Sequence, residues 1–138
     1  MGLLDPFNYS LYYFEIKCLI KRKLKDNEYN LSIGLKCLNT NKDLWYCPKN
    51  ARIFVENFED YLVAPHSIIN NDIFGCGLVY PPNNKMNQEM NKMNQPYVFF
   101  THNGEQICRR DFYLEDNSYL YKPFIEFAGL FCRSEFWK

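Results

Sequence analysis

The sequence predicts an all-β protein, a bent sandwich of two antiparallel sheets, with residues 1–138 forming one domain. Three observations predict this class. Several segments alternate apolar and polar residues with the period of two that marks a half-buried strand. Aromatic residues make up 18% of the chain, and such large side chains suit the wide space between packed sheets. Asn103-Gly104, placed between an apolar run and Ile107, is the strongest short signal for a β-hairpin.

The first expected strand spans residues 12–20. One face carries Glu15 and Lys17, and the core face carries Tyr12, Phe14, Ile16, Cys18 and Ile20. Residues 21–28 interrupt this pattern, and alternation resumes over residues 31–37, so we expect a long hairpin to join the two strands. The basic cluster at 21–25 is interpreted as a solvated turn; a localisation signal or a patch for an acidic partner is the alternative.

Residues 39–50 are expected to form a polar loop rather than a strand. Two interpretations of its aromatic residues stay open. Trp45 fills the core beneath the loop, or Trp45 and Tyr46 stand at a recognition surface as binding anchors. Residues 52–56 are expected to form a short strand, whereas Pro65 limits regular structure in the segment that follows.

Gly75 and Gly77 flank Cys76, so one face of their strand lacks side chains, and we expect another layer or backbone to approach it closely. Residues 81–95 form a low-complexity insertion that should bulge from a hairpin without altering the sandwich. A helical stripe that grips a partner is the alternative for this insertion, through Met86, Met90 and Met93.

The last two strands are expected at residues 119–127 and 130–137, joined by a closing hairpin at Ala128-Gly129. Pro123 has no amide hydrogen to donate, so its strand should lie at a sheet edge or be bulged there.

Composition excludes several function classes. Sixteen basic and sixteen acidic side chains cancel, which disfavours binding to nucleic acid or to an anionic membrane. The six cysteines contain no C-x-x-C pair, so we expect reduced thiols in the core and no metal site. No apolar run approaches the roughly 20 residues of a membrane span, and the start of the chain lacks the features of a signal peptide. The expected location is the cytoplasm, with the nucleus as the alternative.

Catalytic chemistry finds no support in the sequence. His66 and His102 are the candidate bases, and neither lies in a catalytic motif. Motifs for phosphate, dinucleotide or zinc binding are absent from the printed sequence. We therefore expect neither an enzyme nor a cofactor.

Six short phrases occur in an order that resembles the SPRY domain family. The two most specific are residues 72–78, similar to the family's D-x-I-G-C-G, and residues 98–107, similar to its I-F-F-T-K-N-G-x-x-I-G. The remaining phrases are similar to other strands of that family and lie at 12–17, 31–35, 120–125 and 129–136. Two departures stand out: Cys108-Arg109 replace small or apolar residues, and residues 134–137 replace the usual N-F-G ending.

The resemblance, which covers residues 12–136, implies a monomeric module for protein–protein interaction. Such a module binds a short peptide or a folded partner through loops at one end of the sandwich, often as an adaptor within a scaffold or ubiquitin-ligase assembly. The phrases look nearest to the Ran-binding-protein-M type. Matching the strands on either side places the binding loops at 38–45 and 127–130. The predicted contact residues are Asn39, Thr40, Leu44, Trp45, Tyr46, Ala128, Gly129 and Leu130.

Two other functions fit the same strand pattern. A lectin-like sandwich would stack Trp45, Tyr46 and asparagine side chains on a sugar. A purely structural domain of a longer polypeptide would bind no separate partner.

Overall fold

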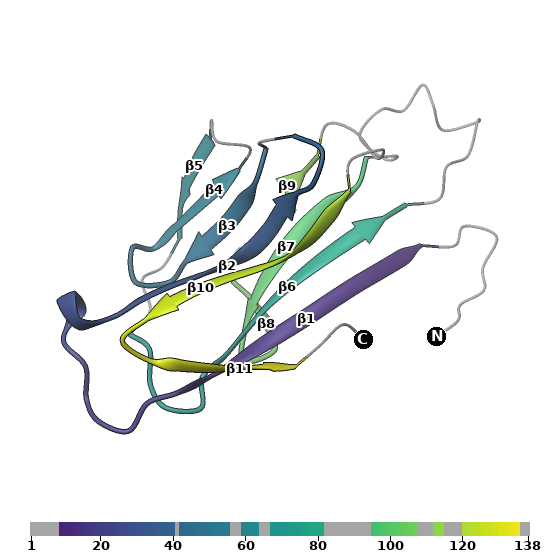
Figure 1. Ribbon diagram of the computed structural model, residues 1–138. Helices are drawn as coiled ribbons and strands as arrows, with labels where there is room; N and C mark the ends of the chain where they lie inside the picture. Colours follow the sequence, from purple (N-terminus) through teal and green to yellow (C-terminus); the bar gives the residue numbers. More distant parts are fainter. Residues whose placement is uncertain are drawn as a thin grey trace, which may run out of the picture.

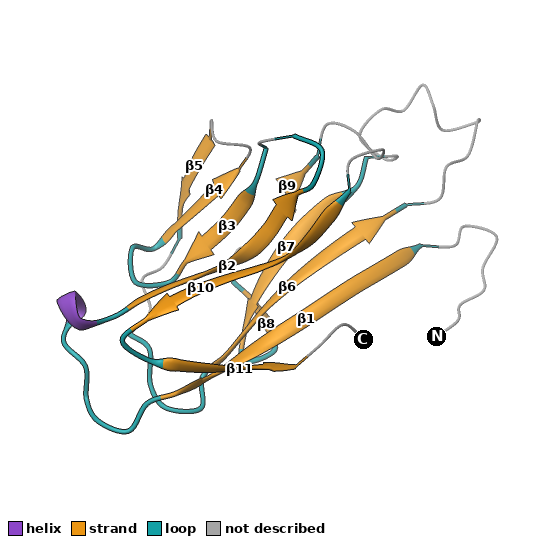
Figure 2. Cartoon of the chain, in the orientation of Figure 1, coloured by secondary structure: helices purple, strands orange, loops and turns teal. Residues whose placement is uncertain are grey.

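The computed structural model describes residues 9–40, 42–55, 59–63, 67–81, 95–107, 112–114 and 120–135. Nearly all of its regular structure is strand, together with one short 3-10 helix, η1 (Asp26–Glu28) (Figure 2). The strands form two antiparallel sheets that lie face to face (Figure 1). The all-β sandwich predicted from the sequence is therefore confirmed.

Within the part of the chain that the structure describes, sheet A has six strands and sheet B has five. Sheet A follows the order β11-β1-β6-β7-β8, and β9 also pairs with β7; its strands are β1 (Ser10–Leu19), β6 (Ile73–Tyr80), β7 (Tyr97–His102), β8 (Glu105–Gln106), β9 (Phe112–Tyr113) and β11 (Phe131–Glu135). Sheet B follows the order β10-β2-β3-β4-β5; its strands are β2 (Asn30–Cys37), β3 (Leu44–Cys47), β4 (Arg52–Val55), β5 (Glu59–Leu62) and β10 (Tyr121–Ala128).

The core fills the space between the two sheets. In β1 the predicted face enters it through Phe14, Ile16 and Cys18, whereas Tyr12 near the start of the strand is 46% exposed. Alternate residues of β2, including Ile33 and Leu35, are fully buried opposite this face. Each fully buried apolar side chain of this kind contributes roughly 1.5–3 kcal/mol to folding.

Two expected hairpins are in fact crossovers between the sheets. β1 belongs to sheet A and β2 to sheet B, so the basic segment at 20–29 carries the chain from one sheet to the other. The turn at Gly129 and Leu130 does the same, because β10 lies in sheet B whereas β11 pairs with β1. An alternating pattern shows which face of a strand is buried, but it does not show the neighbour with which that strand pairs.

Residues 39–50 were expected to contain no strand, and this prediction is wrong. Leu44–Cys47 form β3, which lies between β2 and β4. Leu44 and Tyr46 enter the core, while Trp45 lies on the opposite face. Four residues give too short an alternation to distinguish a strand from a loop that carries aromatic residues.

The expected Asn103-Gly104 turn is confirmed between β7 and β8. Asn103 has a φ of 51° and Gly104 a φ of 87°, the left-handed backbone that such a turn requires. β6 and β7 are antiparallel neighbours, as expected if the insertion at 81–95 joins two strands of a hairpin. Residues 82–94, with Met86, Met90 and Met93, lie outside the described residues. Pro123 lies in β10, an edge strand of sheet B, as predicted.

The two glycines of β6 make room for side chains and not for another layer or backbone. A Cβ atom at Gly75 would meet the Tyr13 hydroxyl and the Thr101 side chain, and one at Gly77 would meet the ring of Phe99. The rings of Tyr13 and Phe99 lie nearly parallel, with centroids 6.1 Å apart and planes at 15°. Side chains of the neighbouring strands β1 and β7 therefore cover this face, in place of the expected layer or backbone. Within the part of the chain that the structure describes, no helix is long and apolar enough to cross a membrane.

Candidate functional site

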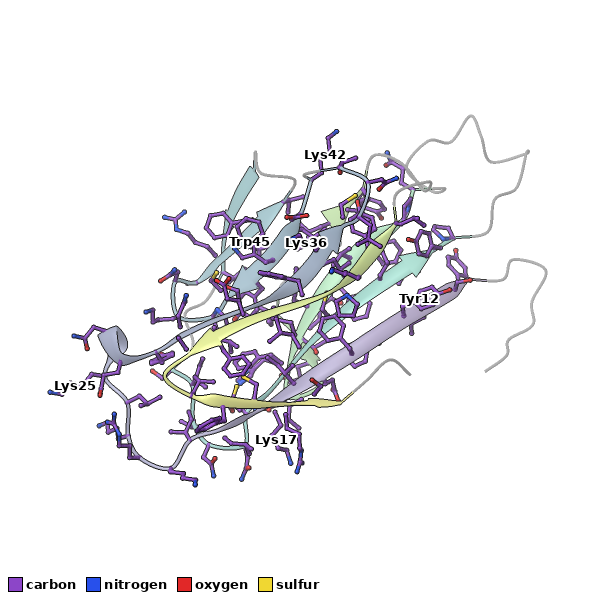
Figure 3. All side chains as sticks on the ribbon, in the orientation of Figure 1. Tyr12, Lys17, Lys25, Lys36, Lys42 and Trp45 are labelled. Atoms are coloured by element: carbon purple, nitrogen blue, oxygen red, sulfur yellow. The ribbon has the colours of Figure 1, made fainter. Side chains whose placement is uncertain are left out.

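The predicted contact residues do not form one surface, because they lie at opposite ends of the sandwich. β10 runs antiparallel to β2, with Tyr121 opposite Cys37 and Ala128 opposite Asn30. The loop with Asn39 and Thr40 follows Cys37, so it lies near the start of β10, whereas the turn at 128–130 lies at its end. A strand of eight residues spans roughly 24 Å. Figure 3 shows the same separation, with Lys42 and Lys25 at opposite ends of the sandwich.

Tyr46 and Trp45 have different roles from those considered for them. Tyr46 is fully buried in the core, with its ring 6.1 Å from that of Phe74 and 5.8 Å from that of Phe100. Its hydroxyl has no hydrogen-bond partner among the described residues, and burial raises its pKa. Trp45 lies half-buried on the outer face of sheet B and stacks on Phe54, with ring centroids 5.1 Å apart (Figure 3). It is therefore neither a core residue beneath a loop nor part of a loop rim.

The remaining predicted residues have local structural roles. Leu44 is fully buried in the core, and Leu130 is also buried. The side-chain oxygen of Asn39 accepts hydrogen bonds from the Cys37 thiol, at 3.1 Å, and from the Leu120 amide, at 3.3 Å. Thr40 accepts a hydrogen bond from the Lys42 amide at 3.0 Å.

Among the described residues, five turns gather at the end of the sandwich that carries Gly129. They are residues 20–29, 48–51, 67–72, 103–104 and 129–130, and we call this region the loop end (Figure 1). Hydrogen bonds tie the turns to one another. The Lys49 ammonium donates to the Tyr29 carbonyl at 2.8 Å, and the Ile20 amide donates to the Asn70 side chain at 2.8 Å.

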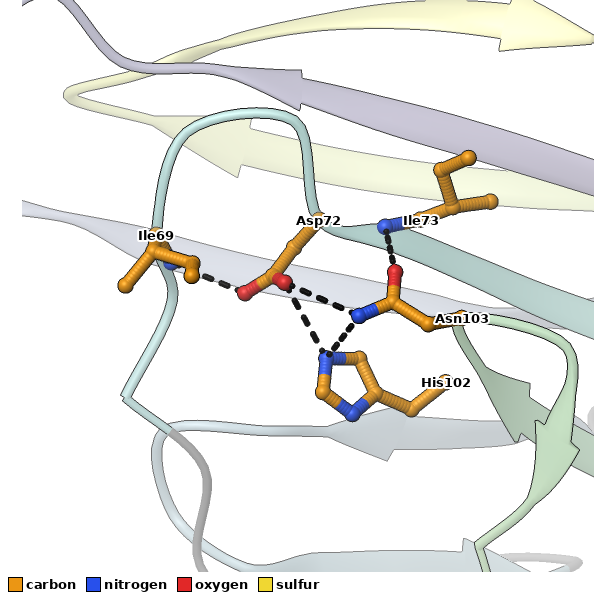
Figure 4. A network of polar contacts seen from close by, with 5 residues as sticks. All are labelled: Ile69, Asp72, Ile73, His102 and Asn103. Atoms are coloured by element: carbon orange, nitrogen blue, oxygen red, sulfur yellow. Dashed lines mark hydrogen bonds and ion pairs between the residues drawn. The ribbon is translucent and has the colours of Figure 1, made fainter.

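A polar network around Asp72 fixes two of these turns (Figure 4). The buried Asp72 carboxylate accepts hydrogen bonds from the Ile69 amide at 2.8 Å and from the Asn103 side chain at 3.2 Å. It also lies 3.3 Å from the imidazole of His102. The Asn103 side-chain oxygen accepts a hydrogen bond from the Ile73 amide at 2.8 Å. The two phrases with the most specific resemblance are therefore joined by direct contacts.

The pairing of Asp72 with His102 is similar in kind to a catalytic acid–base pair, but its contacts are those of a structural network. Both carboxylate oxygens already accept hydrogen bonds, and the imidazole stacks on the Phe74 ring with centroids 4.8 Å apart. The network orients backbone and holds the hairpin of β7 and β8 against the segment before β6. We assign it to positioning the loop end.

A hollow of about 580 Å³ opens at the loop end, between the crossover from β1 to β2 and the segment before β6. Its volume lies in the range of ligand-binding clefts. Apolar side chains and basic side chains both line it, and we call it the basic groove; its residues are Ile20, Lys21, Arg22, Lys23, Leu24, Tyr29, Ser67, Ile68, Ile69 and Asn70. A second hollow of about 220 Å³ adjoins it along the same crossover and reaches Gly129, Leu130 and Phe131.

The charge of the basic groove is only partly compensated. Arg22 forms an ion pair with Glu28 at 2.9 Å, and this contact, together with the Lys25 amide, lowers the pKa of the Glu28 carboxyl. Neither Lys21 nor Lys23 forms an ion pair with another described residue. Ile69, in contrast, is 64% exposed and adds apolar surface to the same groove. The groove therefore offers apolar contact area beside positive charge.

The basic cluster at 21–25 is visible in the sequence, but its place in a groove is not. The other wall of the groove is the segment at 67–70, and no pattern in the sequence predicts that this segment lies beside the crossover. Among the residues that the structure describes, no three His, Cys, Asp or Glu side chains gather in a way that could hold a metal ion. Comparisons with protein-family models, with curated proteins and with solved structures found no match to this chain.

Proposed function

We propose that this chain is a protein-recognition module and that its basic groove binds a peptide segment with acidic residues beside an apolar anchor. The observation that carries the proposal is the composition of the groove. Leu24, Ile68 and Ile69 supply apolar lining. Lys21 and Lys23 line the groove from the crossover that also carries Leu24, and neither has an acidic partner among the described residues. A partner with the opposite charge would be steered toward the groove and held in one orientation.

The loop end is a suitable platform because its turns are joined to one another. The contacts of Asp72 and Asn103 fix the segment at 69–73, and Lys49 fixes the backbone at Tyr29. A site whose walls are fixed before binding loses less conformational entropy when the partner arrives. The groove can therefore gain affinity from a modest contact area.

The SPRY resemblance is part of this proposal and rests on the sequence phrases alone; the structure shows where those phrases lie. Residues 72–78 and 98–107 lie on the adjacent strands β6 and β7 and their turns, and Cys76 is paired with Phe100. The other four phrases lie on or beside β1, β2, β10 and β11. The resemblance implies recognition through loops at 38–45 and 127–130, whereas the basic groove proposed here is lined by residues 20–24, 29 and 67–70. A role as an adaptor in a scaffold or ubiquitin-ligase assembly follows from the resemblance alone.

Selection from a random peptide library displayed on phage, with the immobilised chain as bait, tests the proposal. We expect the selected peptides to combine Asp or Glu with a large apolar residue. The double substitution Lys21→Glu and Lys23→Glu should weaken binding of a selected peptide at least about tenfold, which is 1.4 kcal/mol. The control is the double substitution Lys36→Glu and Lys122→Glu, at two exposed residues that are paired across β2 and β10; it makes the same change in net charge and should leave binding unchanged.

Two results would refute the proposal. Selected peptides without an excess of acidic residues would contradict the charge argument. Equal loss of binding in the groove variant and in the control with Lys36→Glu and Lys122→Glu would show that the effect depends only on the net charge of the chain.

The glycan-binding alternative now depends on the stack of Trp45 on Phe54, because Tyr46 is buried in the core. An aromatic pair on a sheet face can stack on a sugar ring. Reproducible signal on a glycan array that disappears in Trp45→Ala would favour this function over peptide recognition. Absence of binding in both assays would favour a purely structural domain.

A further inference from the structure

Two cysteines lie directly opposite each other on neighbouring strands of sheet A. Cys18 in β1 is paired with Cys132 in β11, which is an edge strand of the sheet. Cys18 is fully buried in the core, and Cys132 is half-buried and packs against the same core. Both side chains therefore point to the same face of the sheet.

The backbone hydrogen bonds show which kind of cross-strand pair this is. The Cys18 amide donates to the Asp72 carbonyl at 2.8 Å, and the Cys18 carbonyl accepts from the Asn71 amide at 2.8 Å. Both bonds point toward the β6 side, so Cys18 directs no backbone hydrogen bond toward β11. In such a pair the Cα atoms lie about 4.5 Å apart. This separation falls within the range of about 4.4–6.8 Å that a disulfide spans.

The pKa values of the two thiols are shifted in opposite directions. Hydrogen bonding with Cys18 lowers the pKa of the Cys132 thiol. The same interaction is the largest cause of the raised pKa of Cys18, and burial is the next. The thiolate is the nucleophile in exchange reactions, so Cys132, which is also the more exposed sulfur, should react first. The smaller hollow, lined by Lys21, Arg22 and Phe131, brings positive charge to the start of the same edge strand.

We propose that Cys18 and Cys132 form a thiol–disulfide exchange site that reacts with a small anionic disulfide, such as oxidised glutathione, to give a cross-strand disulfide. In the first step the Cys132 thiolate attacks one sulfur of the oxidised glutathione. The S–S bond of the oxidant breaks, one glutathione leaves as a thiolate and takes up a proton, and a mixed disulfide remains on Cys132.

In the second step Cys18 loses its proton and attacks the Cys132 sulfur, which releases the second glutathione. The two cysteine thiols are oxidised, and one glutathione disulfide is reduced to two glutathione thiols. The product links the edge strand β11 covalently to β1, next to the turn at 129–130 that borders the smaller hollow.

Three other described cysteines serve as internal controls because no cysteine lies opposite them. Cys37 is paired with Tyr121, Cys47 is paired with Arg52, and Cys76 lies between Phe14 and Phe100. All three are buried. They should stay reduced under conditions that oxidise the pair.

The test treats the reduced full chain with oxidised glutathione, quenches it in acid, alkylates the free thiols, and maps the peptides without reductant by mass spectrometry. Cys108 lies outside the described residues and is replaced by serine in every sample. We expect a disulfide between Cys18 and Cys132, with alkylated thiols at the three control positions. Cys18→Ala should stop at the first step and retain one glutathione on Cys132.

Alkylated Cys18 and Cys132 after this treatment, or glutathione spread evenly over all the cysteines, would overturn the proposal. If Cys18→Ala does not fold, Cys132→Ser, at the half-buried edge position, gives the independent reading. In that variant Cys18 should remain a free thiol, and its oxidation would contradict the proposed order of attack. None of these readings depends on peptide binding.

Discussion

Replacing Gly129 by alanine should destabilise the fold far more than the same substitution at Gly104. Both glycines have left-handed backbone, with φ of 82° and 87°, so a Cβ atom adds about 1–2 kcal/mol of strain at either position. The difference lies in the surroundings. A Cβ at Gly104 would have no atom within 4 Å, whereas one at Gly129 would meet the Glu28 carbonyl and approach the Tyr29 Cα atom to 2.9 Å. Overlap with backbone adds about 1–3 kcal/mol.

We therefore expect a loss of about 1 kcal/mol in the unfolding free energy for Gly104→Ala and about 3 kcal/mol for Gly129→Ala. For a chain of this length, 1 kcal/mol corresponds to a shift of roughly 3–4 °C in Tm. Urea unfolding of the reduced proteins, followed by tryptophan fluorescence, measures both free energies of unfolding. The two variants are compared with one common slope of free energy against urea concentration. Equal costs for the two variants would refute the close contact between the turn at Gly129 and the segment at Glu28.

Three further predictions concern polar groups that are buried or half-buried. Tyr46→Phe should raise the unfolding free energy by about 1 kcal/mol, because it removes a buried hydroxyl without a partner among the described residues; destabilisation in urea would contradict this. Asp72→Ala should lower it by about 3 kcal/mol, because the Ile69 amide and the Asn103 side chain lose their acceptor; a change under 1 kcal/mol would show that the network is dispensable. Burial, opposed by the Thr101 hydrogen bond and reinforced by Glu15, raises the pKa of Tyr13 from 10.0 to about 12. The protonated Tyr13 hydroxyl therefore contributes its full stabilisation below pH 10, and this contribution is lost as the pH rises from 10 to 12. Melting curves at several pH values should show that Tyr13→Phe loses less stability over this range than the unchanged protein does.

Much of the fold could be predicted from local pattern. Alternation identified the buried faces of β1 and β2, because a half-buried strand needs an apolar residue at every second position. The Asn103-Gly104 turn was also readable, because few residues adopt left-handed backbone at both central positions. Pro123 indicated an edge strand or a bulge because it cannot donate to a second neighbour, and β10 is an edge strand.

Pairing between distant strands could not be predicted in the same way. β1 and β2 follow each other in the chain, but they lie in different sheets, and the same holds for β10 and β11. A charged linker such as residues 20–29 fits a hairpin and a crossover equally well. Choosing between them requires knowledge of which faces meet across the core, and this depends on segments more than 100 residues away, such as Cys132 beside Cys18.

The candidate site was predictable only in its charge. The basic cluster at 21–25 is visible in the sequence, and an acidic partner was one of its interpretations. The apolar wall at 67–70 was not visible, because the network of Asp72 and Asn103 brings it into place. The predicted rim that combined Asn39 with Ala128 does not form one surface, because β2 and β10 place these residues at opposite ends of the sandwich.

The most direct measurement of the recognition claim is a titration of the isotope-labelled chain with a selected acidic peptide, followed by amide chemical shifts. The account predicts that the largest shifts fall in residues 20–29 and 67–70, which form the basic groove. Residues 38–40, 42 and 43 at the opposite end should be unchanged. Largest shifts at that opposite end, or around Trp45 on the outer face of sheet B, would contradict the assignment of the basic groove as the binding site.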